Sequence, residues 1–244
     1  PVTITEDMDG LVVEATYKYV ITFIGFGGST VKNDAQPEGE LIVAPEASTE
    51  AEYEFKDWYT EADGKGDKLN TATDKVTGVA TYYAYYVANE YEVVFKINNN
   101  IYASTKAAFG TDITDPGTPG IDVIPAGYTF EGWSEDGKTV LTDLGTVKAG
   151  GNTYLAVLKA SENTPYEIVK YFQTVDGQGW SEAQVTPKTG TTGDIASVDY
   201  DAEAVEGFRI DETISKNNVE ITGDGNAKVI IYYLRNTVNV TING

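Results

Sequence analysis

The sequence predicts a mainly β protein, of the all-β or α+β class, built as a tandem array of small modules. Residues 19–23 (YVITF) resemble residues 91–95 (YEVVF), which lie 72 residues further along the chain. Residues 166–171 (YEIVKY) begin a third such segment after another 75 residues. A repeat of this length is a module that can fold alone, whereas solenoid repeats are shorter. Segments rich in Val, Ile, Tyr and Phe open and close each copy, and such residues favour strands.

The repeats divide the 244 residues into three modules between two partial ones. We expect residues 1–17 to end a preceding repeat, residues 18–89, 90–163 and 164–236 to form modules 1, 2 and 3, and residues 237–244 to start a following segment. A domain this small buries only about 60% of its unfolded surface. The aromatic residues, 11% of the chain with 17 tyrosines, therefore supply much of each core.

The elements of module 1 follow from alternation and turn residues. The prediction, in chain order, is a strand over residues 19–23, a turn over 25–29, a strand over 40–43, one or two helical turns over 46–52, a strand over 53–59, a loop over 61–66 and a closing strand over 80–87. Simple alternation places Tyr53, Phe55 and Asp57 on one side of the fifth of these elements and Trp58 on the other.

Modules 2 and 3 repeat this frame. In module 2 we predict strands over 91–97 and 101–106 around an Asn98–Asn100 turn, a strand over 127–133 and a closing strand over 153–158. In module 3 we predict strands over 166–174 and 180–187 around residues 176–179, a short helical turn over 201–205, a strand over 207–210 without a tryptophan, and a closing strand over 228–234. The polar residues 159–165 predict a loose linker before module 3.

The composition excludes several classes of chemistry. The chain has no cysteine and no histidine, so it has no disulfide, thiolate zinc site, cysteine nucleophile or imidazole base. The net charge of −21 repels phosphate backbones, so we expect no nucleic-acid partner. Apolar runs such as residues 229–234 are too short to span a bilayer, so we expect no membrane insertion. Nothing predicts a cofactor or a metal site.

Modules 1 and 2 resemble the Listeria–Bacteroides repeat, the B-type repeat of internalins. The residues that carry this resemblance are Gly127, Tyr128, Phe130, Gly132, Trp133, Tyr154 and Ala156 in module 2 and Phe55, Trp58, Tyr59, Tyr83 and Ala84 in module 1. Module 1 departs from the pattern at Glu52 and Asp57, where the family has glycine. Module 3 is similar instead to the MucBP (mucin-binding protein) repeat, through residues 169–171, Asp176, residues 190–193, Gly207, Phe208 and residues 229–233.

Both resemblances imply small β-grasp-like modules in surface proteins of bacteria, mostly Gram-positive. The function implied is that of a non-enzymatic stalk or adhesion region at the extracellular face of the cell. Because the negative charge is spread evenly over the modules and opposes their collapse onto one another, we expect an elongated monomer. The alternatives are a carbohydrate- or mucin-binding module, whose partner would be a host glycoprotein or glycan, and a non-catalytic appendage of a secreted glycan-degrading enzyme.

Two residues of module 3 are candidates for ligand binding, namely Trp180 and Tyr171. Trp180 has no counterpart in the other modules and lies beside a glycine-rich hairpin, so we expect it to be the most exposed tryptophan. Trp58 and Trp133 could act as platforms for sugars, but repeated aromatics usually build a shared core. We therefore expect fold markers without a binding role at Phe55, Trp58, Tyr128, Phe130, Trp133 and Phe208.

Other patterns fit ordinary structural roles. Residues 63–67 and 176–179 resemble calcium loops but lack a full ligand set, which indicates turns. Residues 25–30 lack the Gly-Lys-Ser/Thr end of a phosphate loop. The acidic residues between Glu46 and Glu54 could pair as in a glycosidase, but a module this small offers little room for a cleft, so we interpret them as a solvated face. Lys170 and Asn236 could form an intramolecular isopeptide bond.

Overall fold

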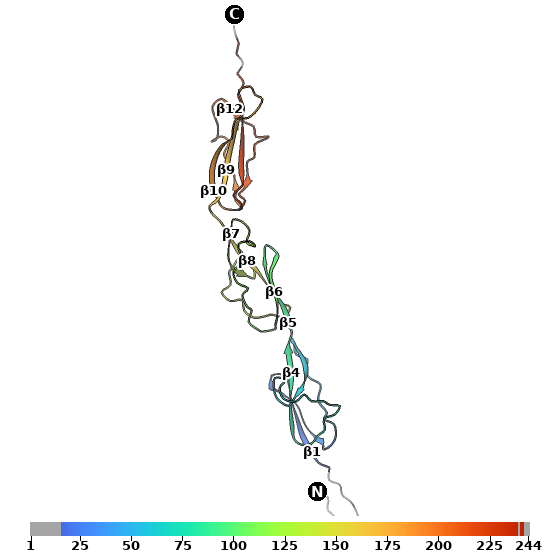
Figure 1. Ribbon diagram of the computed structural model, residues 1–244. Coiled ribbons are helices and arrows are strands. Elements are labelled where there is room, and N and C mark those ends of the chain that lie inside the picture. Colours follow the sequence, from blue (N-terminus) through green and yellow to red (C-terminus); the bar gives the residue numbers. More distant parts are fainter. Residues whose placement is uncertain (1–15, 239, 242–244) are drawn as a thin grey trace, which may run out of the picture. The chain divides into compact units, whose positions relative to one another are not determined.

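Three four-stranded sheets with the same strand order make up the fold (Figure 1). The computed structural model describes residues 16–238, 240 and 241, so most of the predicted partial repeat at 1–17, and parts of that at 237–244, lie outside the described residues. The first sheet has the order β2-β1-β4-β3, the second β6-β5-β8-β7 and the third β10-β9-β14-β12. The first sheet belongs to one compact unit, and the third, with most of the second, belongs to another.

The strands that form these sheets cover nearly all the regular structure. Their bounds are β1 Lys18–Ile24, β2 Thr30–Pro37, β3 Tyr53–Tyr59 and β4 Ala80–Ala88 in the first sheet, β5 Glu90–Ile97, β6 Asn100–Ala108, β7 Tyr128–Ser134 and β8 Asn152–Ala160 in the second, and β9 Thr164–Phe172, β10 Gln184–Gly190, β12 Phe208–Ile210 and β14 Lys228–Arg235 in the third. The short strands β11 (Ile195–Ala196) and β13 (Val219–Glu220) pair with each other. Within the described residues the one helical element is the 3-10 turn η2 (Phe26–Gly28), so the mainly β prediction is confirmed.

The two central strands of each sheet run parallel. Both outer strands of the first and third sheets, and β7 of the second, pair antiparallel with their neighbours. The central pairs are β1 with β4, β5 with β8, and β9 with β14. A parallel pair requires a long connection to bring the chain back to the same end of the sheet. In each sheet this connection carries loops and both outer strands, so the first and last strands of the repeat lie side by side.

A stacked pair of aromatic rings spans the parallel strands in every core. The pairs are Phe23 with Tyr82, Phe95 with Tyr154, and Phe172 with Tyr233, at centroid distances of 5.6, 5.1 and 4.6 Å. Each pair occupies one register position of its parallel ladder. The third sheet thus reproduces the core of the first two, although its sequence pattern differs from theirs.

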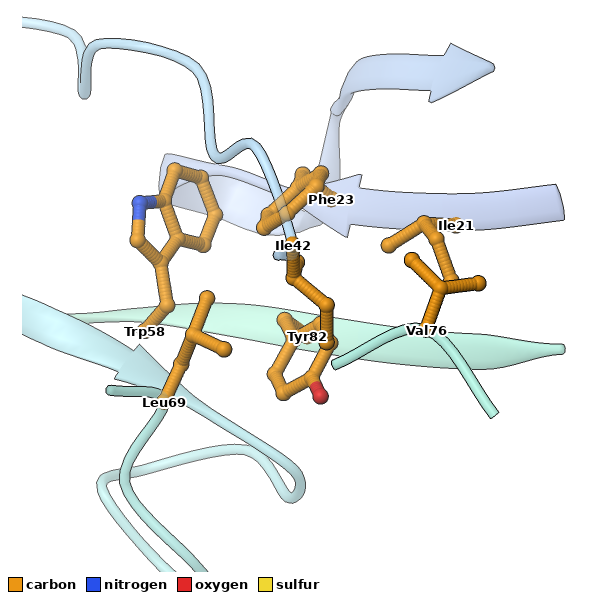
Figure 2. Packing of buried hydrophobic residues seen from close by; sticks show 7 residues of the cluster. All are labelled: Ile21, Phe23, Ile42, Trp58, Leu69, Val76 and Tyr82. Carbon is orange, nitrogen blue, oxygen red and sulfur yellow. The ribbon is translucent and has the colours of Figure 1, made fainter. Parts of the chain in front are cut away.

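The first core shows how the loops complete a sheet that is covered on one face (Figure 2). Ile21, Phe23 and Tyr82 come from the central strands, and Trp58 comes from β3. Three loop residues close the cluster from the connections, namely Ile42, Leu69 and Val76. All seven side chains are at most 8% exposed. The loops therefore act as the second layer of this core, because one small sheet alone could not enclose its apolar face.

Trp58 and Trp133 occupy equivalent buried places, as the repetition predicts. Each is 3% exposed, and each packs edge-on against the core phenylalanine of its own sheet, Phe23 or Phe95, at 5.0 and 4.9 Å. The prediction that Phe55 and Trp58 face opposite sides of β3 is wrong. A β-bulge between Phe55 and Asp57 adds one residue to the strand and brings both rings to the core, 5.6 Å apart.

Several predicted elements of the first sheet are displaced. The second strand is β2, at residues 30–37, and residues 40–43 contribute only an isolated bridge from Leu41 to Lys75. Strand β2 carries polar residues because it is an edge strand with little apolar burial. In place of the helical turns expected over 46–52, residues 46–50 are irregular and 51–52 form a turn, and residues 201–203 form a turn rather than a helix. In module 3 the second strand begins at Gln184, not at Trp180.

One backbone hydrogen bond closes each repeat in the same way. The residue before the outer strand β3, β7 or β12 adopts a left-handed conformation, with φ of 68° at Glu52, 77° at Gly127 and 81° at Gly207. Its carbonyl accepts from the amide of the first residue after the last strand. These donors are Asn89, Ser161 and Asn236, at 2.8, 2.8 and 2.9 Å. The family glycine is thus absent at Glu52, while the left-handed conformation that favours glycine is kept.

The linker before the third sheet is tied down, contrary to the prediction of a loose segment. Strand β8 extends to Ala160 and β9 starts at Thr164, so few residues remain between them. The Thr192 amide donates to the Ser161 carbonyl at 2.9 Å, and the buried hydroxyls of Thr164 and Thr192 are 2.6 Å apart. Polar composition predicted flexibility, but these side chains and amides are used in hydrogen bonds.

The alkaline stability of the third sheet should depend on Tyr233. Burial, and secondarily the charge of Glu203, raise the pKa of Tyr233 to about 12, whereas an unfolded tyrosine titrates near about 10. The folded state therefore favours the neutral phenol, and this stabilisation is complete below about pH 10 and is lost as the pH rises to about 12.

We expect ultraviolet absorbance to show one tyrosine fewer ionising near pH 12 in Tyr233→Phe than in the parent chain. The third sheet of the parent chain should unfold over the same pH range. The substitution also removes the hydrogen bond that the phenol donates to the Glu203 carbonyl at 2.8 Å, so stability at neutral pH is measured in parallel. Identical titrations above pH 10 would contradict the assignment.

Candidate functional site

A partly exposed aromatic cluster lies on the outer face of the third sheet. In β14, Val229, Ile231 and Tyr233 are fully buried on the core face. Since side chains alternate along a strand, Tyr232 points to the opposite face. Tyr171 is its register partner on β9, and the two rings stack with centroids 5.1 Å apart and planes 15° apart.

Trp180 completes this cluster from the connection between β9 and β10. Its backbone forms an isolated bridge with Gln173, and its indole contacts the Tyr232 ring at 4.7 Å with planes inclined by 63°. At 37% exposed it is far more accessible than Trp58 and Trp133, as predicted. We call Tyr171, Tyr232 and Trp180 the aromatic cluster. The structure thus brings together the two candidates named from sequence and adds Tyr232, which alternation along 228–234 could have indicated.

The fold does not require aromatic residues at these positions. The register partners that precede the stacked core pair are Thr22 and Thr81 in the first sheet and Val94 and Thr153 in the second. Small β-branched side chains therefore suffice on this face in sheets of the same strand order. The replacement of both by tyrosine, with a tryptophan added beside them, is particular to the third sheet among the three described.

A tight turn positions Trp180. The Asp176 carboxylate accepts hydrogen bonds from the Thr174 hydroxyl and the Gln178 amide, at 2.6 and 3.1 Å. These bonds, that from Thr174 first, lower the pKa of Asp176 below its usual value. The Thr174 amide also donates to the Gly179 carbonyl at 2.9 Å. Asp176 is therefore engaged in the turn that presents the indole, in agreement with the interpretation of residues 176–179 as a turn.

The face around the cluster combines apolar area with balanced charge. Lys228 and Glu167 form a cross-strand ion pair at 2.9 Å on the same face. Since Tyr171 and Tyr232 cover one another, the indole of Trp180 offers the most accessible ring. An exposed indole with polar neighbours can pack against the CH-rich face of a sugar or against another apolar group. The cluster therefore presents aromatic ring surface for packing.

The remaining candidates have structural roles. Asp63 and Gly64 adopt left-handed conformations within a turn, at φ of 59° and 70°. Residues 25–30 form a closed turn, in which the Gly25 amide donates to the Ser29 carbonyl at 2.7 Å, and strand β2 follows instead of a helix. Both segments are turns, as predicted.

In the acidic segment between Glu46 and Glu54, two carboxylates are engaged with side chains outside the acidic set. Glu46 and Glu54 are exposed, Glu54 pairs with Lys56 at 2.5 Å, and the Glu52 carboxylate accepts from the Tyr91 hydroxyl. Across the residues that the structure describes, no cluster of three or more acidic side chains could hold a metal ion.

The structure separates Lys170 from Asn236, so the isopeptide hypothesis is wrong. Lys170 lies opposite Ile231 on β14, and its ammonium pairs with Glu203. Asn236 is five residues beyond Ile231, about 16 Å further along an extended strand. Its amide instead closes the repeat by donating to Gly207.

Comparison with known proteins identifies the repeats. The model of the Listeria-Bacteroides repeat domain matches residues 19–85 and 91–156, which is more than half of the chain. The chain is similar to two proteins of Evansella cellulosilytica, named "Putative membrane protein" (29% identity over 139 residues, 55% of this chain) and "Putative Gly-rich membrane protein" (32% over 124 residues, 48% of this chain). The matches span only 20% and 13% of those relatives. Of the residues described here, none belongs to a helix that could span a bilayer.

Proposed function

Since the chain belongs to the Listeria-Bacteroides repeat family, we propose that it is a non-enzymatic repeat region of a bacterial cell-surface protein that acts as a stalk and adhesion segment. The family is typical of surface proteins and is usually non-catalytic. The names of the two relatives place those proteins at a membrane, which supports a location at the outside of the cell. The three repeated sheets supply the spacing function, and the chain acts as a monomer.

The aromatic cluster is the observation that carries the adhesion part of this proposal. The other two sheets hold small residues where the third holds Tyr171 and Tyr232. An exposed tryptophan in that place adds apolar surface that the fold does not need. The family model matches residues 19–85 and 91–156, and that the third repeat is of the mucin-binding type is part of the present proposal. We propose that the cluster binds a host glycan or a glycoprotein that carries one.

Charge narrows the glycan class. With a net charge of −21, the chain repels sulfated and other polyanionic glycans at long range. Near the cluster, Lys228 is already paired with Glu167, so it offers little to an anionic ligand. A neutral sugar that stacks on Trp180 avoids this repulsion, and its binding should depend only weakly on salt.

Trp180→Ala should abolish glycan retention without loss of stability. The test is binding of the whole chain to an array of neutral and anionic glycans, with Tyr232→Thr as a second variant and Tyr17→Ala, at a tyrosine that is 63% exposed, as the control. We expect retention of neutral glycans by the parent and Tyr17→Ala, a loss of at least about tenfold for Trp180→Ala, and quenching of indole fluorescence by the bound sugar. Equal retention by all variants would place binding elsewhere. No retention by the parent would reduce the function to that of a stalk.

A further inference from the structure

We propose that the central parallel strand pair of each repeat is a mechanical clamp that bears tension along the chain, and that the clamp of the third sheet is the strongest. The inference deepens the stalk part of the proposed function. It does not depend on the aromatic cluster binding a glycan, because it rests on sheet topology and is measured on the chain alone.

The first argument is the direction in which each pair would be loaded. In the third sheet, tension enters at Thr164, the start of β9, and leaves at Arg235, the end of β14. Because these strands are parallel, the two points lie at opposite ends of the pair. The strands can then separate only by sliding along one another, which loads all hydrogen bonds of the ladder together. An antiparallel hairpin pulled at its open end would lose them one at a time.

The second argument is that the clamps are connected in series with little slack. Strand β4 ends at Ala88 and β5 begins at Glu90, so a single residue separates the first clamp from the second. Strand β8 ends at Ala160 and β9 begins at Thr164. Tension therefore passes from the last strand of one repeat almost directly to the first strand of the next.

The third argument ranks the clamps. The parallel ladders of the first and second sheets each contain four register pairs, whereas that of the third contains six. The third ladder also has stacked aromatic rings on both faces, Phe172 with Tyr233 in the core and Tyr171 with Tyr232 outside. The ion pair from Glu167 to Lys228 joins its strands as well. In the first ladder the outer pair is Thr22 with Thr81.

The test is single-molecule stretching of the whole chain between marker domains. The three repeats release similar lengths, so a ten-residue Gly/Ser insertion between Gly177 and Gln178 is used to mark the third, and it lengthens that step by about 35 Å. We expect the marked step to break last and at roughly 1.5 times the force of the others, from the ratio of six to four register pairs. A marked step that breaks first, or at the same force as the others, would overturn the ranking.

Direction of pulling tests the clamp itself. The chain has no cysteine, so handles can be placed at single sites. Handles at Glu162→Cys and Asn236→Cys shear the β9–β14 pair. Handles at Glu162→Cys and Lys188→Cys peel the β9–β10 hairpin, in which Lys188 is the register partner of Tyr166. We expect a several-fold lower breaking force in the peeling geometry, and equal forces in the two directions would refute the clamp.

The double variant Tyr171→Thr, Tyr232→Thr gives the third outer face the residues of the first. It should lower the force of the marked step and leave the other two unchanged, whereas Tyr17→Ala, at an exposed position outside the three ladders, should leave all three unchanged. An unchanged marked step in the double variant would remove the outer aromatic pair from the clamp. If the double variant fails to fold, the comparison of the two pulling directions, in chains that keep Tyr171 and Tyr232, still decides the proposal.

Discussion

Trp133→Ala is expected to destabilise the second sheet strongly while the first and third sheets keep their stability. The indole is 3% exposed and packs against Phe95, Tyr102 and Phe130. Truncation of a buried tryptophan costs about 3–5 kcal/mol, and a domain of about 70 residues has a total stability of only roughly 4–10 kcal/mol. We expect calorimetry to show one transition lowered by at least about 12 °C. Trp180→Ala, at an exposed position, is the matched control and should change no transition.

Phenylalanine at the same place should be tolerated better than the volume loss suggests. The indole nitrogen of Trp133 is a buried donor without a partner among the described residues. The indole nitrogen of Trp58 is not a buried, unsatisfied donor. An unsatisfied buried donor costs about 1–3 kcal/mol, and Trp133→Phe removes it. Trp58→Phe should therefore lower its transition further than Trp133→Phe does. Equal losses would show that the Trp133 nitrogen finds a partner in solution.

Gly223→Ala is expected to break the packing of the third repeat against the loop that precedes β7. A Cβ at Gly223 would lie 1.7 Å from the Ala126 carbonyl oxygen and 2.7 Å from the Gly127 amide nitrogen. Both contacts are with backbone, so no side-chain rotation can relieve them. The segments must separate, and with them the hydrogen bond from the Thr192 amide to Ser161 should be lost.

Hydrogen exchange measures this effect. We expect the Thr192 amide to exchange at least about 100-fold faster in Gly223→Ala, while the amides of the β9–β14 ladder keep their protection. Gly120→Ala is the control, because a Cβ there meets nothing within 4 Å and its φ is outside the left-handed range. Unchanged exchange at Thr192 would mean that this packing is not maintained in solution.

The fold class and most strands could be predicted because repetition and alternation record them directly. The Asn98–Asn99 hairpin, for example, follows from two residues that accept φ of 47° and 65°. Strand β2 was missed because an edge strand with polar residues has no apolar signal. The faces of β3 were misassigned because a bulge changes the parity of alternation, and no residue type announces it.

The candidate site was predictable only in part. The uniqueness of Trp180 and its glycine-rich surroundings identified the exposed indole. Tyr232 was overlooked because it lies within an apolar run, residues 228–234, in which every second residue is buried. That the Tyr171–Tyr232 pair is particular to the third sheet can be recognised only from the strand register. The register shows that Thr22 and Thr81 occupy the equivalent positions in the first sheet.

The hydrogen bond that closes each repeat has a consequence for how such genes can change. Asn89 donates to Glu52, Ser161 to Gly127 and Asn236 to Gly207, so every donor is satisfied by an acceptor of its own copy. A duplication or deletion of one whole copy would leave the closing bonds of the others intact. Unequal recombination between copies could then alter the length of the array in steps of one repeat, with the sequence of each surviving copy unchanged.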